Sequence, residues 1–244
     1  MYQYKGLEDT IVAISTAMGQ GGIGIIRLSG KDAVVIVDKI FVAANKMKLA
    51  QSPTHTVQYG WVYEKSAPGA DFVDEVLVTL MRGPRSYTRE DVVEISCHGG
   101  SASLRTVLKI ICDAGARLAD PGEFTKRAFL NGRIDLTQAE AVLDIIQSKT
   151  EAFLQVSTHQ LKGELSKELE AIREQLIKIY VEIEAIVNFP EDDTEAYAEV
   201  QKTIGEHIQK AEQCIKELLN SSEHGKILKD GIKIVLCGKP NVGK

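Results

Sequence analysis

The sequence has few of the features that would place it outside the ordinary soluble proteins. Its four cysteines, Cys97, Cys112, Cys214 and Cys237, lie far apart and form no C-x-x-C pair. This suits a reducing cytosol and argues against a disulfide framework or a zinc site. No apolar run approaches the length of a membrane span, and residues 1–6 do not begin a secretory signal peptide. We therefore expect a soluble, cytoplasmic protein that does not engage a membrane.

An excess of positive charge is also missing, since the net charge is −5 and the pI is near 5.6. This balance excludes a chain that binds nucleic acid by bulk electrostatics, although it leaves room for a local basic patch. Hydrophobic content of 44% and charged content of 26% indicate a globular chain rather than a disordered one. At 244 residues, one large domain or two modest ones are expected.

Two differently built halves meet in the stretch 121–146. Pro121-Gly122 ends what precedes it, and the run from Thr137 to Glu140 has the spacing of a capping box that predicts a helix beginning near residue 138. Strand and helix patterns alternate upstream, whereas helical patterns dominate downstream. We expect an α+β protein with a mixed-sheet domain and then a helical bundle. The stretch is either a capped junction or an arginine-bearing loop that completes a ligand site on the first domain.

The first half, residues 1–132, reads as strands alternating with helices. Its glycines at 19, 21 and 24 match the dinucleotide fingerprint G-x-G-x-x-G, but that motif requires a helix at its end and a strand is predicted there. A glycine loop between two strands is favoured instead. Ser29, with Asp32 three residues on, is expected to cap the following helix. The expected strands cover 10–15, 24–29, 57–63, 74–81 and 92–97, with large apolar residues alternating at 57, 59, 61 and 63.

Polar residues of this half, together with Lys149 of the next, give three candidates for function. Glu94 is predicted inside a strand, where a carboxylate is either solvated on an open face or held for a purpose. Cys97 and His98 would be a thiol and imidazole pair, but neighbours in a strand point to opposite faces, which favours a structural role for His98. A small basic patch, of the kind formed by solvated helix ends, comprises Lys126, Arg127 and Lys149.

The second half, residues 133–229, shows apolar residues at spacings of three and four. They run from 165 to 186 and again from 197 to 218, which predicts two long amphipathic helices. With the helix near 138 these would form an antiparallel bundle. Stripes this wide call for a fourth helix, which we expect another chain or a further segment to supply.

The most specific motif lies in residues 230–244. An apolar strand expected at 231–237 runs into G-x-x-x-x-G-K, the phosphate loop of an α/β nucleotide-binding domain. Its backbone N–H groups would wrap a β-phosphate, and its lysine would neutralise the phosphate charge. Position 245 would hold the Mg²⁺ ligand, so the 244 residues alone are not expected to hydrolyse a nucleotide. The expected phosphate-binding residues are Asn241, Val242, Gly243 and Lys244.

These motifs occur in a fixed order along the chain. The order runs through Asp9-Thr-Ile-Val-Ala-Ile, Gly21-Gly-Ile-Gly-Ile-Ile-Arg27, Tyr87-Thr-Arg-Glu-Asp91 with Glu94, His98-Gly-Gly, Gln138-Ala-Glu-Ala141, Phe189-Pro190 and the phosphate loop. Over its whole length the chain resembles the tRNA-modification GTPase family called MnmE or TrmE. Met18 and Asn188 stand where the family pattern has Pro and Asp.

The resemblance implies an N-terminal domain similar to folate-binding aminomethyltransferases, which forms a homodimer and binds 5-formyl- or 5,10-methylene-tetrahydrofolate. It implies a helical domain, completed by a C-terminal helical return beyond Lys244. An inserted G domain hydrolyses GTP with Mg²⁺, and with K⁺ bound through Asn241. With the flavin-dependent partner MnmG (GidA), the family adds an aminomethyl-type group, such as carboxymethylaminomethyl, to the 5-position of wobble uridine in certain tRNAs. No catalytic residue is expected among the 244 residues.

The same residues suit a folate ligand chemically. A reduced pterin presents a 2-amino-4-oxo edge that a carboxylate grips by paired, charge-assisted hydrogen bonds, and Glu94 is the candidate. Arg27 and Arg133 are suitable partners for the tail carboxylates, and which of them meets the tail is open. As expressed, the chain could be a folate-binding dimerisation platform alone. A competing interpretation is a generic P-loop GTPase of the ribosome-assembly type, which leaves Arg27, Glu94 and the junction unexplained.

Overall fold

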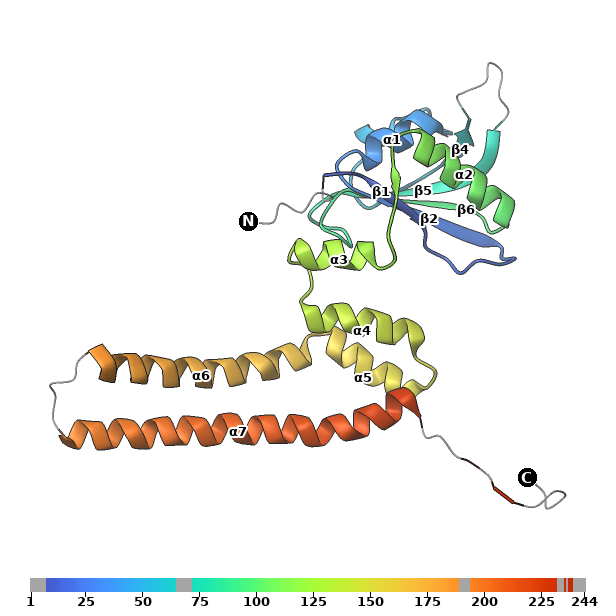
Figure 1. Ribbon diagram of the computed structural model, residues 1–244. Coiled ribbons are helices and arrows are strands. Elements are labelled where there is room, and N and C mark those ends of the chain that lie inside the picture. The colour runs from blue at the N-terminus through green and yellow to red at the C-terminus, as the bar shows by residue number, and fades with distance from the viewer. Residues whose placement is uncertain (1–7, 65–71, 189–193, 232–234, 236, 239–244) are drawn as a thin grey trace. The chain divides into compact units, whose positions relative to one another are not determined.

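The computed structural model describes residues 8–64, 72–188, 194–231, 235, 237 and 238. The chain divides into two compact units, Met1–Ile134 and Asp135–Lys244. Unit 1 contains one sheet with flanking helices, and the described part of unit 2 is helical (Figure 1). The α+β class predicted from the sequence is confirmed.

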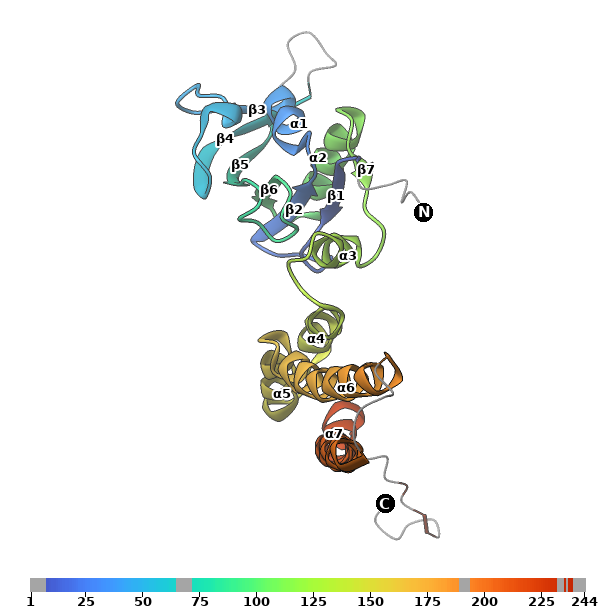
Figure 2. The same cartoon turned by 90° about the vertical axis from the view of Figure 1, so that its left-hand side faces the viewer.

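Unit 1 is built on a seven-stranded mixed sheet with the strand order β3-β4-β5-β6-β2-β1-β7, and the labels of Figure 2 follow this order. Neighbouring strands are antiparallel except β1 and β7, which are parallel. Each predicted strand is present, because β-branched and aromatic residues suit a pleated, half-buried surface. The strands are β1 (Ile11–Ile14), β2 (Ile23–Ser29), β3 (Phe41–Ala43), β4 (Thr56–Tyr63), β5 (Phe72–Met81), β6 (Val92–His98) and β7 (Arg117–Leu118).

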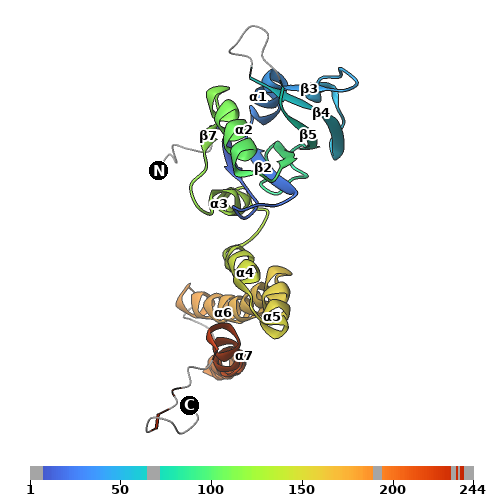
Figure 3. The same cartoon turned by 90° about the vertical axis from the view of Figure 1, so that its right-hand side faces the viewer.

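Two helices, α1 (Ala33–Ile40) and α2 (Ser101–Asp113), cover one face of this sheet (Figures 1 and 3). Their apolar side chains and alternate strand residues form one buried core, in which each fully buried aliphatic side chain contributes about 1.5–3 kcal/mol. A short 3₁₀ turn, η1 (Leu49–Gln51), precedes β4, and α3 (Glu123–Leu130) follows β7.

The glycine-rich segment before β2 is a loop between two strands, as the pattern favoured. Gly24 lies inside β2, so no helix begins at the end of the fingerprint and the dinucleotide interpretation is wrong. A Cβ at Gly24 would lie 2.6 Å from Leu104 Cδ1, so the glycine lets α2 pack closely on the strand. Ser29 does not cap α1, because its hydroxyl bonds Thr88 and Glu90 and the N-cap is Asp32.

The large apolar residues of β4 face away from the helices. Val57 and Tyr59 are 59% and 45% exposed, while Val62 is fully buried. On the other side of β4 there is no space for a side chain at Gly60, because a Cβ there would lie 2.2 Å from the Val42 carbonyl oxygen of β3. We call the uncovered side of the sheet the open face. Register places on it Val42, Val57, Tyr59, Trp61, Leu77, Thr79, Glu94 and Arg27.

A buried arginine ties the end of unit 1 to its beginning. The Arg127 side chain in α3 is 1% exposed, and its guanidinium lies 2.7 Å from Asp9 Oδ1, 3.2 Å from Glu90 Oε1 and 3.2 Å from Glu123 Oε1. It also donates to the Asp9 carbonyl at 2.8 Å. Arg117 bonds two of these carboxylates as well, and its hydrogen bond is the main cause that lowers the pKa of Asp9.

The predicted basic patch is therefore wrong at Arg127. Lys126 is exposed on α3, whereas Arg127, one residue on, points into the carboxylate cluster, and Lys149 belongs to unit 2. Adjacent helical positions point about 100° apart, so two neighbouring cations need not share an environment.

At one end of the sheet, Asp74 joins two strands to α2. Its side chain is 7% exposed and accepts from the His98 backbone N–H at 3.0 Å, from His98 Nδ1 at 2.5 Å and from the Ser103 hydroxyl. The hydrogen bond to Asp74 raises the pKa of His98, and the carboxylate charge raises it further. Burial, the largest influence on Asp74, raises the pKa of this carboxyl, but the bonds from Ser103 and His98 bring it below its usual value.

Unit 2 begins with a capping box two residues earlier than predicted. The N-cap is Asp135, whose side chain accepts from the Gln138 N–H at 2.8 Å while Gln138 Oε1 accepts from the Asp135 N–H at 3.0 Å. Asp135 also accepts from the Ser166 hydroxyl at 2.6 Å, so the cap holds two helices together. The helices of unit 2 are α4 (Leu136–Gln147), α5 (Glu151–Leu161), α6 (Glu164–Asn188) and α7 (Thr194–Asp230).

Helix α5 was not predicted, and it makes four helices in the described part of unit 2. It buries only Phe153 and Ser157, too few residues for a recognisable apolar stripe. Helices α6 and α7 lie side by side (Figure 1) and still expose large apolar side chains. These include Leu176, Tyr180, Ile183, Ile208, Ile215 and Leu219.

The segment 230–244, predicted to begin a nucleotide-binding domain, lies mostly outside the described residues. Of the strand expected at 231–237, the described Gly231, Val235 and Cys237 carry no strand assignment. The phosphate loop from residue 239 onward, including Asn241 to Lys244, is not among the residues described. Among the described helices, none combines the length and the apolar character that crossing a bilayer requires.

Replacing Arg127 with methionine should lower the free energy of unfolding of unit 1 by about 3–5 kcal/mol, because partly buried carboxylates lose their shared cation. The single tryptophan, Trp61, lies in unit 1, so its fluorescence in denaturant measures this unit. As a control, Lys109→Met breaks only an exposed pair with Asp113 and should change the same quantity by less than about 0.5 kcal/mol. Equal effects of the two substitutions would contradict the importance of the buried cluster.

The His98–Asp74 pair predicts a pH-dependent stability. Because the folded-state pKa of His98 lies above its usual 6.5, the pair stabilises unit 1 fully below that pH and the contribution is lost as pH rises through the folded-state pKa. His98→Gln should therefore lower the free energy of unfolding more at about pH 6 than at about pH 9, by Trp61 fluorescence. Asp74→Asn should remove the same pH dependence. A penalty for His98→Gln that is constant with pH would refute this assignment.

Candidate functional site

Two of the candidate residues face each other across neighbouring strands of unit 1. Arg27 in β2 lies opposite Glu94 in β6 in the antiparallel register, so both side chains leave the sheet on its open face. Arg27 Nε and Nη2 lie 2.8 Å and 2.7 Å from Glu94 Oε1. The side chains are 28% and 22% exposed, so the pair is shielded from bulk water yet accessible to a ligand.

Arg133 reaches the same place from the turn that follows α3. Its guanidinium carbon lies 4.8 Å from the centre of the Tyr87 ring, and that of Arg27 lies 5.3 Å from the same ring. The Phe124 ring is 5.8 Å from the Arg27 carbon. These distances are within the range of cation–π attraction. The structure thus places both arginines at one aromatic side chain, with Glu94 bound to Arg27.

Hydrogen bonds fix the segment between β5 and β6 that carries Tyr87. Thr88 is fully buried, with its hydroxyl 2.6 Å from Ser29 Oγ, and its carbonyl accepts from Asn131 Nδ2 at 2.6 Å. The Tyr87 hydroxyl lies 2.9 Å from Thr125 Oγ1 in α3. The segment is therefore tied both to β2 and to the helix and turn that present Arg133.

The cluster offers complementary groups to a small molecule. Both contacts from Arg27 end on Glu94 Oε1, and among the described residues no hydrogen bond reaches Oε2, which could accept from a ligand. Within the same part of the chain no carboxylate pairs with Arg133, which could bind an anionic group. Paired N–H donors and a carboxylate on one ligand, as in a reduced folate, match these groups in kind.

Tyr87, Phe124 and Thr125 are the residues of this cluster that sequence reasoning missed. Tyr87 stood in a quoted motif without a role of its own, and neither Phe124 nor Thr125 was singled out from the sequence. Their contacts depend on how α3 is placed against the segment between β5 and β6, and no local periodicity carries that information.

The pair Cys97–His98 is not a nucleophile and its base. Cys97 is 3% exposed, and burial, aided by the charge of Asp74, raises the pKa of its thiol to about 12. His98 has an exposed side chain that bonds Asp74 instead. The expectation that the two point to opposite faces is confirmed, and the structure gives His98 the structural role described above.

The residues predicted to bind phosphate, Asn241, Val242, Gly243 and Lys244, lie outside the described residues, and so does the potassium ligand expected at Asn241. Elsewhere in the chain, where the structure describes it, no group of three or more His, Cys, Asp or Glu side chains could hold a metal ion.

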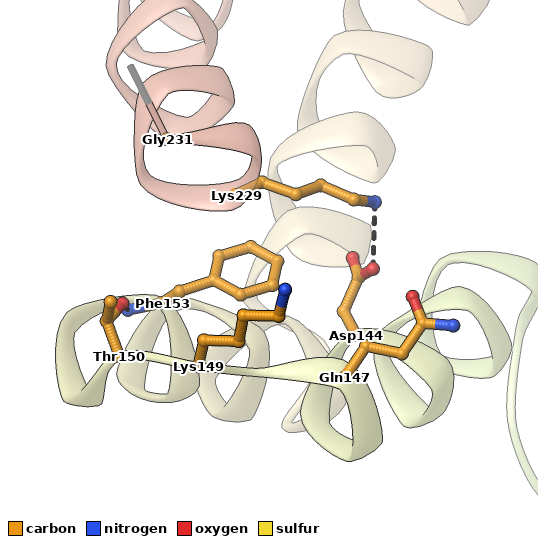
Figure 4. A pocket seen from close by; sticks show the side chains of 7 residues that line it. All are labelled: Asp144, Gln147, Lys149, Thr150, Phe153, Lys229 and Gly231. Atoms are coloured by element: carbon orange, nitrogen blue, oxygen red, sulfur yellow. Dashed lines mark hydrogen bonds and ion pairs between the residues drawn. The ribbon is translucent and has the colours of Figure 1, made fainter. Parts of the chain in front are cut away.

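Unit 2 contains a recess of about 650 Å³ where the turn between α4 and α5 meets the end of α7 (Figure 4). Lys229 Nζ lies 2.8 Å from Asp144 Oδ1 across it, and the Asp144 side chain is 14% exposed. Phe153 and Lys149 line the other side. The ion pair holds the last turn of α7 against α4. It does not indicate which ligand, if any, the recess would bind.

Comparison with known proteins covers nearly the whole chain. The family model described as "GTP-binding protein TrmE N-terminus" matches residues 10–133, and "MnmE helical domain" matches residues 136–235. Among curated proteins, "tRNA modification GTPase MnmE" of Carboxydothermus hydrogenoformans is 48% identical over 238 residues, covering 98% of this chain and 51% of that protein. The proteins of the same name from Alkaliphilus oremlandii and Geobacter sulfurreducens are 45% and 47% identical with the same coverage.

The chain spans about half the length of the curated relatives it matches. The first family model alone matches half of the 244 residues, and the second begins one residue after the start of unit 2. The chain belongs to the MnmE (TrmE) family.

Proposed function

We propose that unit 1 binds a reduced folate, with Arg27, Glu94 and Arg133 as the residues that hold it. The observation that carries this proposal is that two guanidinium groups, from a strand and a turn distant in sequence, lie over the Tyr87 ring, and that one of them binds the Glu94 carboxylate of the neighbouring strand. A structural ion pair would need only Arg27 and Glu94. The second guanidinium has no structural partner of opposite charge among the described residues, which supports a ligand role.

The roles follow from the chemistry of each group. Glu94 accepts paired hydrogen bonds from the 2-amino-4-oxo edge of the pterin through Oε2, while Arg27 fixes the carboxylate through Oε1. An arginine binds an anionic group of the ligand, since a guanidinium matches a carboxylate in geometry. The bound 5-formyl- or 5,10-methylene-tetrahydrofolate supplies a one-carbon unit.

At the level of the whole protein, we propose a cytoplasmic tRNA-modification GTPase, which the names of the relatives support. With the flavin-dependent partner MnmG, it would add an aminomethyl-type group to wobble uridine at the expense of GTP. Asn241, Val242, Gly243 and Lys244 would contact the GTP phosphates, with K⁺ at Asn241 and Mg²⁺ held from beyond residue 244. The 244 residues alone would bind folate and dimerise without hydrolysing GTP. A generic ribosome-assembly GTPase would share the phosphate loop but has no use for the Arg27–Glu94 cluster.

We propose that residues 1–132 form the folate-binding and dimerisation domain, residues 133–229 the helical domain and residues 230–244 the start of the G domain. The open face supports dimerisation, because Tyr59 and Leu77 lie directly opposite each other on it and are 45% and 46% exposed. In the helical domain, the apolar side chains exposed on α6 and α7 would receive the C-terminal helical return.

The folate assignment predicts that Glu94→Ala weakens binding of 5-formyltetrahydrofolate by about 2–4 kcal/mol, since it removes a shielded, charge-assisted hydrogen-bond pair. Isothermal titration of the 244-residue chain measures this directly. The matched control is Glu170→Ala, which removes another arginine-paired glutamate, 2.6 Å from Arg173 and exposed on α6. Undiminished affinity in Glu94→Ala, or an equal loss in both variants, would reject the assignment.

Dimerisation through the open face predicts that Val57→Lys lowers the molar mass found by light scattering toward that of one 26.8 kDa chain, because a charge on each copy would be buried at the interface. Val35→Lys is the control, since Val35 lies on α1, which covers the opposite face, and is 53% exposed against 59% for Val57. An unchanged mass for Val57→Lys, or dissociation by both variants, would count against this interface.

A further inference from the structure

Tyr87 lies at the centre of the cluster without belonging to any charged pair. Its ring is 5.3 Å from the Arg27 guanidinium carbon and 4.8 Å from that of Arg133, and its hydroxyl is 2.9 Å from Thr125 Oγ1. It is the point at which β2, α3 and the turn after α3 meet. The next residue, Thr88, is held by a buried hydrogen bond to Ser29 and by a second one from Asn131, so the ring is presented in one place.

The two arginines depend on this ring to different degrees. Arg27 is oriented by Glu94, which takes both of its contacts on one carboxylate oxygen. Arg133 has an exposed side chain and, in the part of the chain that the structure describes, no carboxylate partner. Two cations near one another repel, and the negative face of an aromatic ring offsets that repulsion. For Arg133 the Tyr87 ring is therefore the main contact that sets the direction of the guanidinium.

This difference separates the roles of the two arginines. The charge of Arg27 is countered by Glu94 before any ligand arrives. The charge of Arg133 is not countered in this way, so Arg133 is the better partner for an anionic group that the ligand brings. A ring that orients Arg133 therefore affects how the anionic group of the ligand is bound. It does not affect the hydrogen bonds between Glu94 and the edge of the pterin.

We propose that Tyr87 is a positioning residue that orients Arg133 toward the anionic group of the ligand and so sets the preference for anionic folates over uncharged pterins. The inference rests on the proposed folate site and gives a role within it to a residue that one of the motifs contains but to which no function was assigned. The aromatic ring does the positioning, and the hydroxyl only fixes the ring against Thr125.

Isothermal titration of the 244-residue chain with two probes tests the proposal. For 5-formyltetrahydrofolate, Tyr87→Leu should raise Kd by about tenfold, the loss expected when a cation–π contact of about 1.4 kcal/mol with the half-buried Tyr87 ring no longer orients the arginine. For 6-methyltetrahydropterin, which has no anionic tail, Kd should change by less than about twofold. Tyr87→Phe keeps the ring and should restore folate affinity to within about threefold of the wild-type value.

A double-mutant cycle with Arg133→Ala distinguishes positioning of the arginine from a general structural role of Tyr87, because only positioning makes the effect of Tyr87→Leu on folate affinity depend on Arg133. In the Arg133→Ala background, Tyr87→Leu should cost less than about twofold in folate affinity, because the guanidinium it orients is gone. Tyr180→Leu, which removes an exposed tyrosine of α6 in unit 2, is the matched control and should change neither Kd. Additive losses, or equal losses for both probes, would overturn the positioning role.

A ligand-independent arm separates this inference from the folate assignment. In arginine-labelled protein, the Arg133 side-chain NMR signals should lose their ring-current shift in Tyr87→Leu and keep it in Tyr87→Phe. If the wild-type chain binds no folate while these shifts behave as described, the folate proposal fails and the orientation of Arg133 by Tyr87 stands. Arg133 signals that are identical in the wild type and Tyr87→Leu would overturn the inference whatever binds.

Discussion

The buried guanidinium of Arg127 is the contact on which the arrangement of unit 1 depends. It binds carboxylates from three separate places: Asp9 before β1, Glu90 before β6 and Glu123 within α3. A cation taken out of water is tolerated only when such partners surround it, so none of the three segments can move away alone without a large penalty. Since Glu90 follows Tyr87 by three residues and α3 leads directly to Arg133, the same contact aligns the two sides of the candidate site.

Much of the fold could be predicted from the sequence because its signals are local. Runs of β-branched residues marked the strands, and spacings of three and four marked α6 and α7. Glu94 could be singled out because a carboxylate among strand valines and isoleucine needs an explanation. Arg27 and Arg133 were joined to it by resemblance, and the register between β2 and β6, a long-range property, is what places Arg27 against Glu94.

What could not be predicted depends on packing between distant segments. Arg127 looked like a surface cation beside Lys126. Nothing in the neighbouring sequence shows that the helix directs the Arg127 side chain toward Asp9 and Glu90. The apolar residues of β4 resembled a core face. The buried side of the strand instead carries Gly60 and Gln58, and at Gly60 the backbone of β3 lies too close for a side chain. The short helix α5 escaped notice because Phe153 and Ser157 form no stripe, and the capping box was read from Thr137 when Asp135, two residues earlier, makes the bond.

The direct pairing of Arg27 with Glu94 across two antiparallel strands has a consequence for how this surface can change. Successive side chains of a strand alternate between its two sides, so inserting or deleting one residue within β2 or β6 would send one partner into the core and leave the other outside. The connecting loops can vary in length without disturbing the pair. The strands themselves cannot vary in length in this way. The spacing of residues within β2 and β6 therefore constrains this chemistry as tightly as the identity of the charged residues does.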